Sequence, residues 1–346
     1  SRPWSAPDPG GAPVLAVDIP SGLDGLTGAV VGDPMAATRT VTIAALKPGL
    51  LFGSGPDLAG EVVVADIGLD VSGATAHLVE DAGMAEMLPV RSRVAHKWRS
   101  ALLVVAGSPG MTGASHLVCR AAMRAGAGYV HLDTAATDGS SIPTEVVSSL
   151  GGTGVRPDQS RFAAAVVGPG LGRSASPAGL VRTVLTAVDV PVVVDGDGLA
   201  AVAESPDVVR SREAETVLTP HDGEYERLVG DRPGADRMAS ARALAADLGA
   251  VVLLKGPATV IADPSGRVLV STAGDARLAT AGSGDVLSGI IGAFLAQGVS
   301  AFEAAAAGAF VHGRAAERGP AAGLIASDLP DLLSETIAAL RSEPGS

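Results

Sequence analysis

Short apolar runs alternate with stretches of helical periodicity along most of the chain. Six of the runs have the length and the valine-rich composition of buried strands: Ala101–Ala106, Gly128–Leu132, Ala164–Val167, Val192–Asp195, Val217–Thr219 and Val251–Lys255. Helical spacing of apolar residues marks Glu80–Leu88, His116–Ala125, Leu180–Ala187 and Met238–Leu248. This alternation predicts an α/β fold with a mainly parallel sheet that is covered by helices.

The pattern changes after the sixth strand. Thr259–Ala262 and Val268–Ser271 are joined by a turn sequence and predict a hairpin on the edge of the sheet. From Val286 onward the apolar residues follow one buried helix face. Two more helices are expected at Phe302–Arg318 and Leu329–Leu340.

The first part of the chain has a different character. Val14–Asp18, Arg39–Ala44 and Glu61–Asp66 read as strands joined by turns rich in Gly and Pro, without a long helix. We expect a boundary near Val71–Ala76 and interpret this part as an incomplete Rossmann-like α/β segment. Its strands lack covering helices, so we expect a preceding segment to complete the sheet. The N-terminus has neither an initiating Met nor a signal peptide, and we interpret it as an internal cut.

Composition narrows the possible partners. Hydrophobic residues make up 47% of the 346 and aromatic residues only 3%, so Ala, Val and Leu must form the core. The net charge of −12 and the lack of a basic block argue against binding to nucleic acid or an anionic membrane. No apolar run is long enough to predict a membrane span. The single Cys119 suits a reducing compartment, and we expect a cytoplasmic protein. The Ala-rich helices of the chain could pack within the fold or between subunits, so the sequence is compatible with a homo-oligomer.

The run Ala279–Leu287 carries the most chemical information. Two glycines, a hydroxyl and the carboxylate of Asp285 come directly before an apolar helix. Free backbone N–H groups at a helix start can hold a phosphoryl group, and Asp285 could then accept a proton from an attacking hydroxyl. The same sequence also suits an ordinary helix cap, in which Ser283 or Asp285 satisfies the free N–H groups.

Five other loops follow the carboxyl ends of predicted strands. They are Gly107-Ser108, Gly168-Pro169-Gly170, Asp195-Gly196-Asp197, Thr219-Pro220-His221 and Lys255-Gly256. In a parallel sheet these ends lie at one edge, where α/β proteins commonly bind ligands. The loops are therefore expected to meet at one site, which favours catalysis by Asp285 over a simple cap.

Together with the Asp285 run, several motifs over Glu80–Leu340 resemble the NAD(P)H-hydrate dehydratases of the ribokinase-like superfamily. They are His96-Lys97, Val105-Ala106-Gly107-Ser108, Thr112-Gly113-Ala114, Gly168-Pro169-Gly170-Leu171-Gly172, Leu218-Thr219-Pro220-His221 with Gly223-Glu224, and Leu254-Lys255-Gly256. The resemblance implies a three-layer αβα sandwich over residues 76–346. Residues 1–75 resemble the C-terminal part of an NAD(P)H-hydrate epimerase domain, through Val17-Asp18-Ile19-Pro20-Ser21-Gly22-Leu23, Thr27-Gly28, Lys47-Pro48-Gly49 and Asp66-Ile67-Gly68.

The resemblance implies nucleotide repair. ADP, or ATP, would phosphorylate the ring hydroxyl of (6S)-NAD(P)H hydrate (NADHX or NADPHX), and loss of phosphate would restore NADH or NADPH. The implied roles are catalysis by Asp285; substrate binding by Ala114, Gly170, Gly172, His221 and Asp285; nucleotide binding by Lys255, Gly256, Pro257, Ala258, Thr259 and Gly284; an anion hole at Gly282, Ser283 and Gly284; and water-mediated Mg²⁺ binding by Glu224. In the epimerase-like part, Asp18 would contact substrate and Ser21 would bind K⁺. Without the family's N-terminal substrate loop, little or no epimerase activity is expected.

Simpler interpretations stay open for several of these residues. Glu224 could serve simply to start a helix, with His221 as a loop residue beside it. Lys255 could extend into solvent, and Gly168–Gly172 could be no more than a tight turn between a strand and a helix. Two functions compete with dehydration: phosphorylation of a sugar or hydroxyethylthiazole by a small-molecule kinase, and regulation by a nucleotide-binding protein without catalysis. The loops 98–100, 196–198 and 274–276 depart from the usual family sequence.

Overall fold

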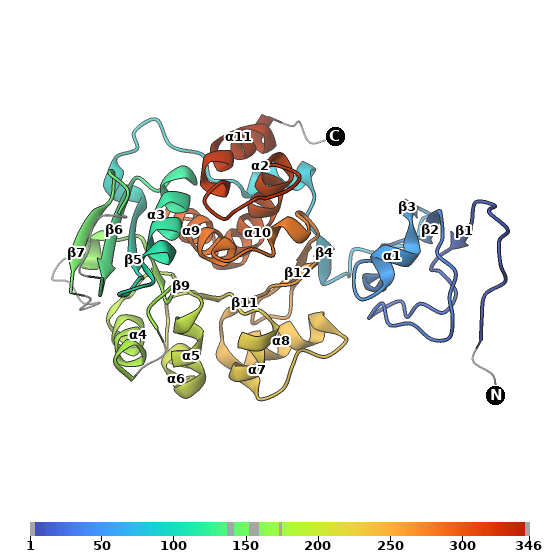
Figure 1. The fold of residues 1–346 in the computed structure, drawn as a ribbon, viewed down its shortest axis with the longest axis horizontal. Helices are drawn as coiled ribbons and strands as arrows, with labels where there is room; N and C mark the ends of the chain where they lie inside the picture. Colours follow the sequence, from blue (N-terminus) through green and yellow to red (C-terminus); the bar gives the residue numbers. More distant parts are fainter. Residues whose placement is uncertain (1–3, 137–141, 152–158, 173–174, 343–346) are drawn as a thin grey trace. The chain divides into compact units, whose positions relative to one another are not determined.

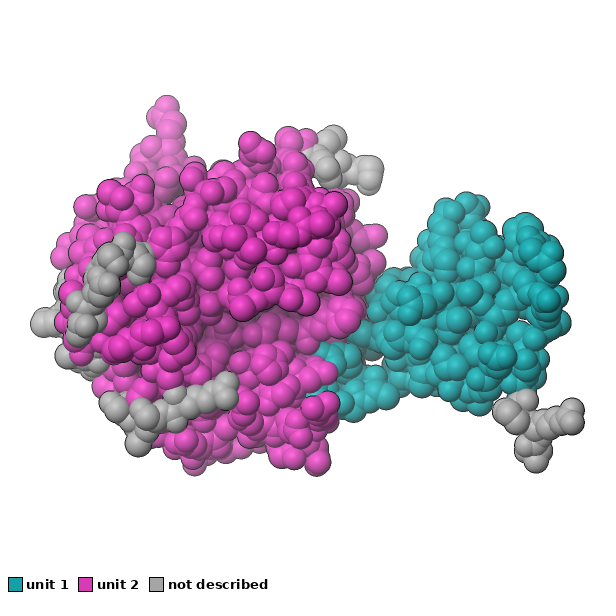
Figure 2. Space-filling view, in the orientation of Figure 1, with its two compact units in different colours: residues 1–75, 233–240 teal, residues 76–232, 241–346 magenta. Residues whose placement is uncertain are grey.

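The computed structural model describes residues 4–136, 142–151, 159–172 and 175–342. These residues form two compact units, which Figure 2 shows in different colours. Unit 1 contains residues 1–75 and 233–240, and unit 2 contains residues 76–232 and 241–346. No helix in the described parts of the chain is both long and apolar enough to cross a bilayer.

Unit 1 holds a small parallel sheet. Its strands are β1 (Leu15–Val17), β2 (Arg39–Ile43) and β3 (Glu61–Ala65), paired in that order. One helical turn, η1 (Pro48–Leu50), and one short helix, α1 (Gly55–Ala59), accompany them. The three predicted strands are confirmed, and the buried core here consists of Leu23, Leu50 and Ala59.

Unit 2 is built on a ten-stranded sheet in the order β4-β13-β12-β11-β10-β9-β8-β5-β6-β7. The seven strands from β11 to β7 are parallel, whereas β12 runs antiparallel to both of its neighbours. The strands are β4 (Ala76–Leu78), β5 (Ala101–Val105), β6 (Tyr129–Thr134), β7 (Val147–Leu150), β8 (Ala164–Val167), β9 (Val192–Val194), β10 (Thr216–Leu218), β11 (Val251–Leu254), β12 (Thr259–Ala262) and β13 (Val268–Ser271). The central strands are wholly buried because helices cover both faces, which explains their continuous apolar sequences.

Helices form the two outer layers (Figure 1). On one face lie α2 (Asp81–Met87), α3 (Thr112–Arg124), α9 (Ser283–Ala296), α10 (Ala301–Arg318) and α11 (Leu329–Ser342). On the other lie α4 (Ala175–Ala187), α5 (Asp197–Glu204), α6 (Asp207–Arg210), α7 (Asp222–Val229) and α8 (Arg237–Leu248). The 3₁₀ turns η2 (Lys97–Ser100), η3 (Gln159–Arg161) and η4 (Ala276–Leu278) complete the elements. The predicted three-layer αβα sandwich is confirmed.

The edges of the sheet differ from the prediction. The hairpin β12–β13 does not form the edge, because β4, which begins at the last residue of the expected boundary, pairs in parallel with β13. At the other end, β7 was not predicted, because its sequence Val-Ser-Ser-Leu lacks an apolar run. Short edge strands have little apolar pattern, since their pairing depends on a neighbour that is distant in the sequence.

Helix α9 crosses the centre of the sheet and is buried along most of its length. A Cβ atom on Gly289 would lie 2.3 Å from the carbonyl oxygen of Val118 in α3, and one on Gly292 would lie 2.5 Å from a methyl carbon of Val166 in β8. The two glycines therefore let α9 approach its neighbours closely. This packing fixes the start of α9 at the carboxyl edge of the parallel strands.

Candidate active site

The five strand-end loops meet as the sequence predicted. They follow β11, β10, β9, β8 and β5, which are consecutive neighbours in the sheet. Hydrogen bonds connect the loops directly: Gly107 N donates to Pro169 O at 2.8 Å, Ser108 Oγ to Gly170 O at 2.9 Å, and Lys255 N to Pro220 O at 2.8 Å. The five loops therefore lie side by side along the carboxyl edge of the parallel strands, and Lys255 and Asp195 lie beside the start of α9.

The N-terminus of α9 is free of a side-chain cap. The N-cap residue is Gly282, at φ +91°, and a Cβ there would lie 2.5 Å from Leu117 Cδ1. The hydroxyl of Ser283 donates instead to the carbonyl of Leu278 at 2.8 Å. The alternative in which Ser283 or Asp285 caps this helix is therefore wrong, and the first N–H groups of α9 have no cap side chain to bind. Such a helix start, with its positive dipole end, suits an anion.

Asp195 is the buried centre of the polar network. Its carboxylate accepts hydrogen bonds from Thr219 Oγ1 at 2.7 Å, Lys255 Nζ at 3.0 Å and Ser288 Oγ at 2.8 Å. Burial opposes its ionisation, but the charge of Lys255 and these hydrogen bonds outweigh burial and hold the pKa of Asp195 below its usual value. Ser288 in particular was missed by sequence reasoning, because its position in an apolar helix resembles a core site.

Lys255 points into the site. Its Nζ lies 3.0 Å from Asp195 Oδ1 and 3.5 Å from Glu224 Oε2, and 22% of its side chain is exposed. Burial alone would lower the pKa of Lys255, yet the two carboxylates raise it, so the ammonium stays charged. A Cβ on Gly284 would lie 3.5 Å from this Nζ and 3.7 Å from Asp195 Oδ2. The alternative of a solvent-directed lysine is therefore wrong.

Asp285 lies in the first turn of α9 and carries an unusually basic carboxylate. Burial raises its pKa to about 7, and the negative charges of Asp195, Asp197 and Glu224 add to the effect, while Lys255 opposes it. A carboxylate with a pKa near neutrality can accept a proton far better than an ordinary Asp. The raised pKa of Asp285 is in keeping with its predicted role as general base.

His221 and Glu224 form a capping box at the start of α7. His221 Nδ1 accepts from the backbone N–H of Gly223 at 3.0 Å, and Glu224 Oε2 accepts from His221 N at 2.9 Å. Glu224 therefore does start a helix, as the simpler interpretation held. The same carboxylate also faces Lys255, and 55% of the His221 side chain is exposed for contact with a ligand.

The structure also brings together the small residues that were assigned to substrate. A Cβ on Gly170, at φ +62°, would lie 2.7 Å from Ala114 Cβ, so the β8 loop rests on the start of α3. Gly172 N donates to Asp197 Oδ2 at 2.8 Å. On the other side of the site, residues 255–259 form the turn from β11 to β12, with Gly256 and Pro257 exposed and Ala258 buried.

One further ionisable group lies behind the helix start. His312 of α10 is buried and has a hydrogen bond to the Ser283 backbone, and its Nε2 has no hydrogen-bond partner within the described ranges. Burial, aided by the charge of Lys255, lowers the pKa of His312 to about 4. A neutral imidazole therefore packs against the start of α9. Sequence reasoning missed it inside an Ala-rich helix.

The epimerase-like residues lie in unit 1. Asp18, at φ +70°, accepts hydrogen bonds from Ile43 N at 3.0 Å and Thr42 Oγ1 at 3.3 Å, and it pairs with Lys47 Nζ at 2.5 Å. The bond from Lys47 is the largest factor that lowers the pKa of Asp18. Ser21 is exposed in a turn. Their roles toward substrate and K⁺ stay predictions.

The fold is that of the ribokinase-like α/β proteins. A ribokinase-like superfamily protein from Enterococcus faecalis superposes with a TM-score of 0.68 over 80% of this chain and 100% of that chain, at 20% identity. Within that class, the sequence profile of NAD(P)H-hydrate dehydratase matches residues 102–339, and the chain belongs to this family. The profile of the YjeF-related protein N-terminus matches residues 5–49.

Individual relatives agree with this family assignment. The bifunctional NAD(P)H-hydrate repair enzyme Nnr of Mycobacterium tuberculosis H37Rv is 44% identical over 261 residues, which covers 75% of this chain and 53% of the relative. The Nnr of Coxiella burnetii is 38% identical over 339 residues, covering 91% and 67%. The ADP/ATP-dependent NAD(P)H-hydrate dehydratase of Bacillus subtilis, crystallised with ATP and Mg²⁺, shows 30% identity and a TM-score of 0.67, covering 75% and 97%. The chain spans about half the length of the first curated relatives it matches.

Proposed function

We propose that unit 2 catalyses the ADP-dependent dehydration of (6S)-NADHX and (6S)-NADPHX to NADH and NADPH. The observation that carries this proposal is the Asp285 carboxylate, whose pKa is raised to about 7, beside the uncapped start of α9. That pairing supplies a base and an anion-binding helix end at one place. Family membership supplies the substrate class, which geometry alone would leave open between several kinase-like reactions.

In the first step, Asp285 accepts the proton of the ring hydroxyl. The hydroxyl oxygen forms a bond to the terminal phosphorus of ADP, and the bond from that phosphorus to the bridging oxygen breaks, so AMP leaves. The N–H groups of residues 282–284 and the ammonium of Lys255 stabilise the negative charge on the transferring phosphoryl group. Lys255 is well suited to this role because Asp195 and Glu224 keep it charged.

In the second step, the new phosphate ester leaves from the ring. The carbon–oxygen bond breaks with its electron pair going to phosphate, while the lone pair of the ring nitrogen assists. Loss of a proton from the neighbouring ring carbon then restores the dihydronicotinamide. One NADHX and one ADP therefore give NADH, AMP and phosphate. Phosphorylation is needed because hydroxide is a poor leaving group.

Magnesium fits this site as a partner of the nucleotide. The described residues contain no group of three His, Cys, Asp or Glu side chains that could hold a metal by themselves. Mg²⁺ commonly keeps several waters and binds to phosphates with one or two carboxylates, so a dedicated protein cage is not needed. Glu224 would hold the ion through water, and the ion would neutralise phosphate charge.

The direct test is recovery of NADH absorbance when the protein is incubated with NADHX and ADP, with ATP in a parallel reaction. We expect turnover by the wild-type chain and its loss in Asp285→Ala. Consumption of nucleotide only in the presence of a sugar or hydroxyethylthiazole, with no NADH formed, would instead establish the small-molecule kinase. Binding of nucleotide without any product would favour a regulator.

For unit 1 we propose that it contributes little or no epimerase activity in this chain. In support, Asp18 is held by Lys47 and by the backbone of Ile43, and the strands leave Val17 and Val63 exposed by 68% and 40%. Incubating the chain with the (6R) hydrate and following its conversion to the (6S) form, with and without K⁺, tests the proposal. Rapid epimerisation would contradict it.

A further inference from the structure

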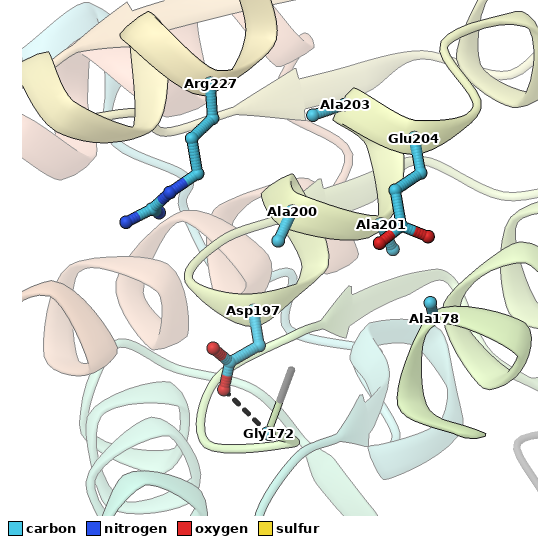
Figure 3. Close-up of a pocket in the computed structure, with 8 residues that line it drawn as sticks. All are labelled: Gly172, Ala178, Asp197, Ala200, Ala201, Ala203, Glu204 and Arg227. Atoms are coloured by element: carbon cyan, nitrogen blue, oxygen red, sulfur yellow. Dashed lines mark hydrogen bonds between the residues drawn. The ribbon is translucent and has the colours of Figure 1, made fainter. Parts of the chain in front are cut away.

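A pocket of about 380 Å³ lies beside the candidate active site on the α4–α5–α7 face of the sheet (Figure 3). Its floor and walls are mostly alanine side chains from α4 and α5, and its polar groups are Asp197, Glu204 and Arg227. Gly172, one of the glycines predicted to contact the hydrated dinucleotide, lines the pocket. The pocket is therefore next to the proposed binding region for the reacting ring.

The arrangement of the sheet separates two binding regions. Residues 255–259, which are predicted to bind ADP, follow β11, whereas Gly170 and Gly172 follow β8, with β10 and β9 between them. A dinucleotide whose ring reaches Asp285 has a second nucleotide that must lie outside the ADP region. Gly172 leads directly from the β8 loop into the pocket.

The polar groups of the pocket differ in their availability. The Asp197 carboxylate accepts the Gly172 N–H at 2.8 Å, as the dashed line in Figure 3 shows. Glu204 lies 3.8 Å from Arg182. Arg227 projects from α7 with no hydrogen bond or ion pair to any described residue, and Figure 3 shows it on the side of the pocket away from Glu204. Among the described residues, Arg227 is therefore a cation at the pocket rim that has no acidic partner.

We propose that this pocket binds the adenosine half of the hydrated dinucleotide and that Arg227 binds one of its phosphates. The proposal rests on the proposed function of unit 2. A guanidinium presents paired donors that match a phosphate, and the alanine walls leave room for a flat base. The Asp197 and Glu204 carboxylates can accept hydrogen bonds from ribose hydroxyls, as acidic residues do in other dinucleotide sites. The phosphate is either the pyrophosphate, common to both substrates, or the 2′-phosphate of NADPHX.

The first experiment measures kcat and KM for NADHX and NADPHX at saturating ADP in wild type, Arg227→Ala and Arg232→Ala. Arg232 is the matched control, because it is 76% exposed, pairs with Glu226 and does not line the pocket. We expect Arg227→Ala to raise KM by roughly tenfold with little change in kcat, in the KM for ADP or in Tm. A rise for NADPHX alone identifies the 2′-phosphate, and an equal rise for both substrates identifies the pyrophosphate.

A second variant tests the pocket without altering charge. In Ala200→Leu the larger side chain would fill part of the pocket, so KM should rise for both hydrates. Calorimetric titration with ADP-ribose and its 2′-phosphate gives a readout that does not need turnover. The proposal is overturned if Arg227→Ala and Ala200→Leu both leave KM and ADP-ribose binding unchanged. Absence of turnover by the wild type would contradict the proposed function instead, and the titration would still decide the subsite.

Discussion

Replacing Asp285 by Asn should remove catalysis and at the same time stabilise the free protein. Asn has nearly the same shape as Asp but carries no charge and cannot act as a base. Burial and three nearby carboxylates raise the pKa of Asp285 to about 7 from 3.8. The folded protein therefore binds a proton here that the unfolded chain has lost, and its stability falls as pH rises from about 4 to about 7.

The size of the effect follows from that pKa. One pKa unit corresponds to about 1.4 kcal/mol, so the ionised Asp285 destabilises the folded state by at most about 4 kcal/mol above pH 7. Water reaches part of this carboxylate, so we expect about 2 kcal/mol of stabilisation by Asp285→Asn at pH 8. For a unit of this size that corresponds to a rise in Tm of about 4 °C.

The assay is thermal unfolding of both proteins between pH 4 and pH 8, together with turnover of NADHX. The difference in Tm should grow with pH and level off above about 7. Asp275→Asn is the matched control, because bonds from Arg277 lower the pKa of Asp275 to about 2, so its loss should reduce stability at pH 8. An Asp285→Asn protein with normal turnover, or with no gain in Tm at pH 8, would refute the reasoning.

Further outcomes are expected at the same site. Asp195→Asn should lower the midpoint of the pH–kcat/KM profile, because the charge of Asp195 raises the pKa of Asp285. Denaturant titration of the same variant should show a loss of about 3 kcal/mol in the free energy of unfolding, because the buried ion pair with Lys255 is broken. Gly282→Ala should lower Tm strongly, because Gly282 has a φ of +91° and is closely packed. Gly284→Ala should fold normally but raise KM for ADP. Equal Tm values for the two variants would contradict this prediction. Glu224→Gln should raise the Mg²⁺ concentration needed for half-maximal rate, and an unchanged Mg²⁺ dependence would remove the metal role.

Much of the fold could be predicted from the sequence because it depends on local patterns. Buried parallel strands such as β5 and β8 are continuous apolar runs, and α9 shows its buried face in the spacing of Val286, Ile290 and Phe294. The convergence of five loops followed from one rule, that parallel strands end at a common edge. The candidate base, Asp285, was identified from a local pattern too, the run of two glycines and a serine directly before an apolar helix.

Other features depended on contacts between residues far apart in the sequence. The pairing of β4 with β13 joins segments that are almost two hundred residues apart, so no local pattern reveals it. The direction of Lys255, inward to Asp195 and Glu224, and the free helix start at Gly282 were likewise decided only by packing. The sequence by itself determined which residues could do the chemistry. The tertiary structure decided the basicity of Asp285, because that depends on burial and on charges brought together from separate strands.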